Sequence, residues 1–133
     1  MGAGSTILTT GVRTGWTREL SYGGNILYGV IWSGIQFIIV GDSGTEGLLA
    51  TMQTSFDGIT WTPQSPAIGN SLYAAAWSGT QFMAVGQFGV TQTSPDGIDW
   101  TSRGVLSTDL YGVVCFNNQF ISVGKYGEIF TGA

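Results

Sequence analysis

Four acidic residues are the strongest candidates for chemistry in this sequence: Asp57, Asp96, Asp99 and Asp109. Paired carboxylates can act as general acid and base, and a dense group of them can bind Ca²⁺. However, Asp57 and Asp96 each stand directly before a glycine, where an aspartate accepts hydrogen bonds from nearby backbone N–H groups and caps a turn. No calcium-loop pattern is present. The sequence also contains no His, so the commonest general base and metal ligand is missing.

These carboxylates are therefore interpreted as structural. We expect structural turns at Asp57, Gly58, Asp96 and Gly97, and we expect no enzyme activity, no metal site and no cofactor. The glycine-rich turn from Gly86 to Gly89 and its two counterparts do not predict a phosphate-binding loop, because no Lys follows them and no helix is expected there.

Tryptophans at recurring positions are the alternative candidates for a binding site. They are Trp16, Trp61 and Trp100 in one repeated phrase, and Trp32 and Trp77 in another. Exposed rings at these places could stack on sugars, and several weak equivalent sites would bind a glycan multivalently. The interpretation that we favour is packing between neighbouring sheets.

The phrases that contain these residues repeat along the chain. LYGVIWSGIQFIIVG at 27–41 returns as LYAAAWSGTQFMAVG at 72–86 and as LYGVVCFNNQFISVG at 110–124. Between them, SFDGITW at 55–61 returns as SPDGIDW at 94–100, with a degenerate TGVRTGW at 10–16. A repeat of about forty residues, built from short β phrases and glycine turns, is typical of β-propeller blades.

Each unit is expected to form four short strands, and no segment has the periodicity of a helix. The predicted strands are Tyr28–Trp32, Gln36–Val40, a third ending near Ser55 and Ile59–Thr62, and then Tyr73–Trp77, Gln81–Val85, Val90–Ser94 and Ile98–Thr101. The predicted hairpin turns are Ser33-Gly34, Asp57-Gly58, Ser78-Gly79, Asp96-Gly97 and Asn117-Asn118, with type I′ geometry at the Asp-Gly pairs. An insertion in the first unit is placed around Thr45–Ala50.

The two ends of the chain are expected to hold incomplete units. Ile7–Thr10 and Trp16–Thr17 match a third and fourth strand, and Glu128–Thr131 matches another third strand. The prediction is a single all-β domain, a partial β-propeller of about three four-stranded antiparallel blades, with units at about 1–26, 27–71, 72–109 and 110–133. Propellers typically close with four to eight blades, and an open arc would expose apolar faces and unpaired edges.

We therefore expect the arc to be completed by oligomerisation or by neighbours in an assembly. The candidate intersubunit strands contain Ile7, Leu8 and Thr9 at one end and Ile129 and Phe130 at the other. At least one of these two segments is expected to pair across a subunit boundary, because both match the third strand of the repeat unit.

The S-x-D-G-x-x-W phrase, followed by L-Y-x-V-x-W-S-G-x-Q-F-x-x-V-G-x-x-G, resembles the BNR/Asp-box-like propeller repeats. These occur in sialidase-type propellers, in photosystem II assembly-factor-like proteins, and in phage and bacterial surface proteins. The resemblance implies a propeller over most of the chain and implies that the aspartate turn is structural. In the sialidase box a residue separates Asp from Gly, whereas Asp57 and Gly58 are adjacent. The sialidase arginine triad and catalytic Tyr/Glu pair have no counterparts, so sialidase activity is not implied.

The composition restricts the partners. Charged residues make up 9% of the chain and the formal net charge is −4, whereas about 25% of the residues of an average globular protein are charged. The four basic residues form no cluster, so nucleic acid is not an expected partner. No apolar run approaches the roughly 20 residues of a membrane span. We expect no signal peptide, and the single Cys115 cannot form an internal disulfide.

Two functions follow from these observations. The first is a non-catalytic structural protein, a phage virion component such as a head-decoration, tail or fibre-associated subunit. It would bind copies of itself and other virion proteins, and would be found in the virion or outside the cell after cytoplasmic synthesis. The alternative is a multivalent lectin whose ring closes by homo-oligomerisation and binds surface glycans. A lectin should expose its repeated tryptophans, whereas a structural subunit should bury them.

Overall fold

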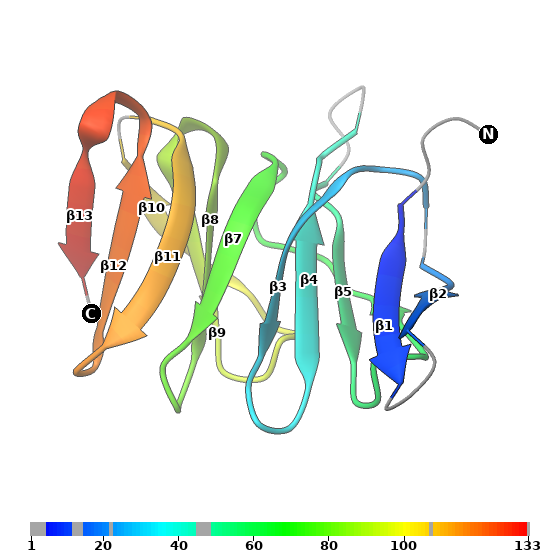
Figure 1. Ribbon diagram of the computed structural model, residues 1–133. Coiled ribbons are helices and arrows are strands. Elements are labelled where there is room, and N and C mark those ends of the chain that lie inside the picture. The colour runs from blue at the N-terminus through cyan, green and yellow to red at the C-terminus, as the bar shows by residue number, and fades with distance from the viewer. Residues whose placement is uncertain (1–4, 12–14, 22, 45–48, 107, 133) are drawn as a thin grey trace.

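A computed structural model describes residues 5–11, 15–21, 23–44, 49–106 and 108–132. In these residues the chain is all-β, with four antiparallel sheets and no α-helix, as the repeat predicted. The sheets stand in a row along the chain, from β1 and β2 at one end to β13 at the other (Figure 1). The insertion predicted around Thr45–Ala50 lies mostly outside the described residues.

Each sheet pairs consecutive strands in chain order. The first contains β1 (Ile7–Gly11) and β2 (Gly15–Glu19). The second contains β3 (Leu27–Trp32), β4 (Phe37–Gly41), β5 (Met52–Ser55) and β6 (Thr62–Pro63). The third contains β7 (Leu72–Trp77), β8 (Phe82–Gly86), β9 (Val90–Ser94) and β10 (Thr101–Val105), with a 3₁₀ turn at Gln87–Gly89. The fourth contains β11 (Leu110–Phe116), β12 (Gln119–Gly124) and β13 (Ile129–Gly132), with a 3₁₀ turn at Lys125–Gly127.

The first strands of the last three sheets, β3, β7 and β11, lie side by side (Figure 1). In each of them the pairing register with the next strand shifts at the tyrosine that follows the first leucine. The ring centroids of Tyr28 and Tyr73 are 5.0 Å apart, and those of Tyr73 and Tyr111 are 5.3 Å apart. The same irregularity therefore recurs at the same position of all three repeats.

The predicted fourth strands are wrong in their bounds. Residues 57–60 and 96–99 bend within loops, and the strands begin only at Thr62 and Thr101. The predicted type I′ turns are also wrong, because Gly58 and Gly97 have positive φ (79° and 83°) while the aspartates before them do not. Side-chain hydrogen bonds hold a longer loop in place of a tight turn.

The turn predicted at Asn117-Asn118 is confirmed. Both asparagines have positive φ, 51° and 62°, and they connect β11 to β12 directly, since Phe116 pairs with Gln119. Asparagine tolerates this left-handed conformation better than most residues with a side chain. Ser33 and Ser78 instead begin wider loops, in which their backbone N–H groups donate to the carbonyls of Gln36 and Gln81, both at 2.9 Å.

The hydrophobic core lies between sheets and is divided among their interfaces. Sheet β3–β6 contributes Ile38, Val40 and Met52 to a cluster with Leu72 and Phe82 of sheet β7–β10. The next interface buries residues of β7 and β8 against β11 and β12: Ala76, Met83 and Val85 with Leu110, Val113 and Phe120. Because strand side chains alternate between faces, each sheet presents apolar residues on both sides and needs a neighbour on each.

Candidate interaction surface

The Asp57 carboxylate, which is predicted to be structural, accepts hydrogen bonds from its own loop. Its Oδ1 accepts hydrogen bonds from the backbone N–H groups of Ile59 (2.8 Å) and Thr60 (2.9 Å), and from the Ser55 hydroxyl (3.0 Å). The carbonyl of Gly58 accepts a hydrogen bond from the indole N–H of Trp61 at 3.1 Å. The repeated Ser, Asp, Gly and Trp therefore act together as one hydrogen-bonded loop.

The loop at 94–100 has the same arrangement. Asp96 Oδ1 accepts from the backbone N–H groups of Ile98 (2.9 Å) and Asp99 (3.0 Å), and from the Ser94 hydroxyl (3.1 Å). The Trp100 indole donates to the Gly97 carbonyl at 3.0 Å. Hydrogen bonds within the loop engage one oxygen, Oδ1, of each carboxylate. Among the described residues no three His, Cys, Asp or Glu side chains gather as metal ligands would.

These hydrogen bonds lower both carboxyl pKa values. The N–H of Thr60, followed by that of Ile59 and the Ser55 hydroxyl, lowers the pKa of Asp57 below its ordinary value of 3.8. The N–H of Asp99 is the largest cause of the lowered pKa of Asp96, followed by that of Ile98. Both carboxyl groups are therefore stabilised in their ionised form in the folded chain.

Acid is expected to weaken the fold through these loops. The folded-state pKa of each aspartate lies below its unfolded-state value. The stability that the ionised carboxylates contribute to the fold is therefore complete above pH 3.8 and is lost as pH falls through the lower folded-state pKa. In an Asp57→Asn/Asp96→Asn variant, each side chain keeps an acceptor oxygen but does not titrate, so stability should fall less steeply between about pH 4 and pH 2. Urea unfolding at a series of pH values measures this. The exposed Asp99→Asn serves as control, and an unchanged acid profile in the double variant would contradict the account.

The five predicted tryptophans do not share one environment. Phe37 lies between Trp32 and Trp61, with ring centroids 4.5 Å and 6.1 Å away, and Phe82 lies likewise between Trp77 and Trp100, at 4.4 Å and 6.4 Å. Trp61 is buried, Trp100 and Trp77 are half-buried, and Trp32 is partly exposed. Trp16 is largely exposed and stands apart from both aromatic groups.

The predicted intersubunit strands lie at opposite ends of the row of sheets (Figure 1). Of β1, Ile7 is buried against Ile39 and Trp61, whereas Leu8 is exposed. Of β13, Ile129 is exposed and Phe130 packs against the second interface cluster. Within the described residues, β1 pairs with β2 alone and β13 with β12 alone, so each leaves one strand edge unpaired.

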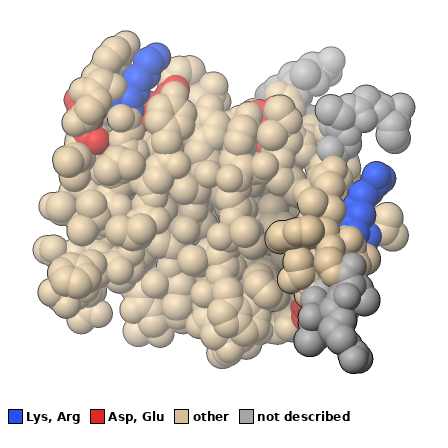
Figure 2. Space-filling model, in the orientation of Figure 1, with Lys and Arg blue, Asp and Glu red and all other residues tan. Residues whose placement is uncertain are grey.

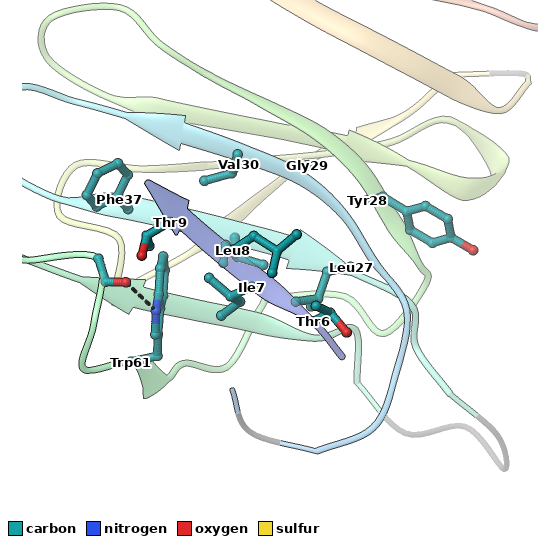
Figure 3. A pocket seen from close by; sticks show the side chains of 12 residues that line it. Thr6, Ile7, Leu8, Thr9, Leu27, Tyr28, Gly29, Val30, Phe37 and Trp61 are labelled. Atoms are coloured by element: carbon teal, nitrogen blue, oxygen red, sulfur yellow. Dashed lines mark hydrogen bonds between the residues drawn. The ribbon is translucent and has the colours of Figure 1, made fainter. Parts of the chain in front are cut away.

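A groove lies between β1 and β3, with a volume of about 410 Å³ (Figure 3). Its walls are mostly apolar: Ile7 and Leu8 of β1, Leu27 and Val30 of β3, and Phe37 and Ile39 of β4. Val30 is exposed here, whereas Val113, at the same position of the last repeat, is buried by sheet β7–β10. In the part of the chain that the structure describes, sheet β1–β2 has two strands beside β3–β6, so the groove is the place where the inner strands of a complete sheet would lie.

At the other end, the outer face of sheet β11–β13 is apolar and uncovered. Val114 and Val123 are 59% and 47% exposed, whereas Ala76 and Val85, at the same positions of the preceding repeat, are 3% and 1% exposed. Those two residues are buried because the next sheet covers them. Of the groove residues, the sequence pointed to Ile7, Leu8, Thr9 and Trp61 but not to those of β3 and β4, nor to this outer face. Alignment of the three repeats shows that these positions stay apolar.

The face on which the first strands of the last three sheets lie carries little charge. Figure 2 shows that the face formed around β3, β7 and β11 is almost free of Lys, Arg, Asp and Glu, with the few charged side chains near its margins.

In the described part of the chain, no helix is both long and apolar enough to cross a membrane.

Comparisons with known proteins support the architecture. No protein-family model and no curated protein matches the chain. Its structure is similar to that of YCF48 from Cyanidioschyzon merolae, with a TM-score of 0.64 and 22% sequence identity over 81% of this chain and 34% of that one. At this identity the likeness concerns the fold alone, and it confirms the predicted propeller-like architecture. The chain spans about a third of the length of that structure.

Proposed function

We propose that this chain is a non-catalytic propeller module of the BNR/Asp-box-like type that joins copies of itself and serves as a structural part of an ordered assembly. A phage virion is the setting that we favour, with the chain as a head-decoration, tail or fibre-associated subunit that contacts other virion proteins. The two Ser-x-Asp-Gly-x-x-Trp loops support the repeat type, because their hydrogen bonds are the same at both places.

One observation carries the proposal. Apolar positions that are buried between sheets in the middle of the chain are exposed in the last sheet, as Val85 and Val123 illustrate. Large continuous apolar patches on a soluble protein typically mark an interaction site. Three sheets from each copy, the two complete ones and one assembled from the ends, would make six in a dimer, which lies within the typical propeller range of about four to eight.

The low charge of the chain also favours an ordered assembly. Surfaces with few charged groups pack closely against neighbours at little desolvation cost. Copies that assemble in the cytoplasm and leave within a virion need neither a disulfide nor a strong net charge. The proposed location is accordingly the virion, or the extracellular space after release.

Self-association is tested by measuring molecular mass in solution. Native mass spectrometry and analytical ultracentrifugation should detect a species larger than the 14.0 kDa chain. Val123→Asp should weaken that association at least about a hundredfold, because an unpaired charge would be buried in the contact. Val105→Asp is the matched control, since Val105 is at least as exposed as Val123 but lies on the outer strand β10. A wild-type monomer at all concentrations would contradict the proposal.

A glycan-binding role is the second candidate, because Trp32 and Trp77 recur in register and Trp32 is partly exposed. A lectin that closes its ring by homo-oligomerisation would present several such rings to a surface glycan. Isothermal titration with neutral and sialylated oligosaccharides tests this, and Trp32→Ala should then remove binding. If no sugar binds at millimolar concentration, the lectin function fails while the structural role stands.

A further inference from the structure

Among the described residues, the first and last sheets are short of strands on complementary sides. Sheet β1–β2 has no inner strands there to fill the groove beside Val30. Sheet β11–β13 has no outer strand there, and Val114 and Val123 are exposed on its outer face. The missing strands of the first sheet are of the kind that the last sheet already contains, because β11 and β12 repeat the sequences of β3 and β4.

The strands β1 and β13 occupy equivalent positions in the repeat. In sheet β3–β6, Ile38 of the second strand pairs with Thr54 of the third. In the last sheet, Ile121 pairs in the same way with Thr131. Thr9 stands at this position in the first sheet, and Ile7-Leu8-Thr9 reads like Ile129-Phe130-Thr131. A β12 strand could therefore accept β1 in the register that it now offers to β13.

We propose that β1 of one copy pairs with β12 of a second copy, so that the second copy's β11 and β12 fill the groove between β1 and β3. This inference rests on the self-association proposed above and names its contact. The resulting sheet has four strands, in the order β11–β12 of the second copy and then β1–β2. The four residues of β13, mostly exposed, give way to β1 in the exchange.

The exchange would bury the surfaces that are now open. Val114 and Val123 of the second copy would face Val30 and Phe37, as Ala76 and Val85 of β7–β8 face Val113 and Phe120 within the chain. Backbone hydrogen bonds along the free edge of β1 would add to this apolar contact. Both parts of the contact repeat interactions that the chain already makes internally.

A polar contact supports the same arrangement. Within the chain, the Gln36 side chain of one sheet donates to the carbonyl of Asp96 in the aspartate loop of the next sheet, at 2.7 Å. Gln119 is the counterpart of Gln36, and it is exposed in the last sheet. In the composite sheet, Gln119 of the second copy would reach the carbonyl of Asp57, the counterpart of Asp96.

Cysteine crosslinking tests the register. In a Cys115→Ala background, Thr9→Cys/Ile121→Cys should form a disulfide between chains, because directly paired antiparallel strands bring their Cα atoms to about 4.5–5.5 Å, within disulfide range. Thr9 lies in β1 and Ile121 in β12, and these strands belong to sheets at opposite ends of the row (Figure 1), so a single copy cannot link the two residues. Denaturing electrophoresis without reductant should show the covalent dimer as the main product, and reductant should remove it.

The matched variant, Ile121→Cys/Thr131→Cys, reports on β13, because these residues pair within one chain. In the assembled protein it should crosslink much less than the first pair. If it forms an intrachain disulfide in full while Thr9→Cys/Ile121→Cys remains uncrosslinked in a protein that does self-associate, the strand exchange is wrong and the structural proposal stands. If the protein is monomeric throughout, both fail.

Discussion

Replacing Phe82 by Ala is expected to lower the free energy of unfolding by about 3–5 kcal/mol, which is the usual cost of removing a buried phenylalanine. Phe82 is 1% exposed and lies in the cluster between sheets β3–β6 and β7–β10. Its ring also contacts Trp77, with centroids 4.4 Å apart. The cavity would open at the closely packed interface between these two sheets, where little relaxation can compensate for it.

The measurement is urea unfolding followed by tryptophan fluorescence, at one protein concentration for every variant, because association would shift the apparent stability. Phe56→Ala is the matched control, since Phe56 is exposed on its loop and the same atoms are removed. Its effect should stay within about 0.5 kcal/mol. Equal losses for the two variants would mean that the sheets do not pack through Phe82.

Gly86→Ala is expected to cost about 1–3 kcal/mol or more, as an overpacked site does. Gly86 ends β8 in extended backbone, so the left-handed conformation is not the issue. A methyl group at this position would overlap the Ser71 carbonyl oxygen and lie 2.7 Å from the Leu72 Cα. Both are backbone atoms, which cannot rotate away from the methyl group as the end of a flexible side chain can. The same carbonyl accepts the backbone N–H of Gln87 at 2.8 Å, so a shift would also break this hydrogen bond.

The corresponding control is Gly132→Ala, because a methyl group at Gly132 meets nothing within 4 Å among the described residues. Thermal unfolding should show a clear loss for Gly86→Ala and little change for Gly132→Ala. The same crowding recurs at Gly41 and Gly124, which face the carbonyls of Ile26 and Asp109. If Gly86→Ala is as stable as the wild type, close backbone approach does not explain the recurring glycine.

The repeat made much of the fold predictable. Strands β3 and β7 begin one residue before the predicted starts at Tyr28 and Tyr73, and β11 begins where the third repeat begins. Apolar and β-branched runs between glycine turns are a strong local signal for strands. The prediction of tight hairpins at the Asp-Gly pairs is wrong. A dipeptide does not reveal that the Ser55 hydroxyl accepts the Gly58 N–H at 2.8 Å and widens the loop. The loop conformation depends on hydrogen bonds among the repeated Ser, Asp, Gly and Trp, and not on the Asp-Gly pair alone.

Residue types and local spacing were enough to predict the strand order and the repeat length, and the amino-acid sequence also shows that His and clustered basic residues are absent. Which of the repeated residues are covered follows, in contrast, from the packing of the sheets. Val85 and Val123 have the same side chain and the same position in the repeat, yet one is buried and the other exposed. The difference arises because burial depends on whether another sheet lies on that face, and this property belongs to the stack of sheets and not to any single repeat.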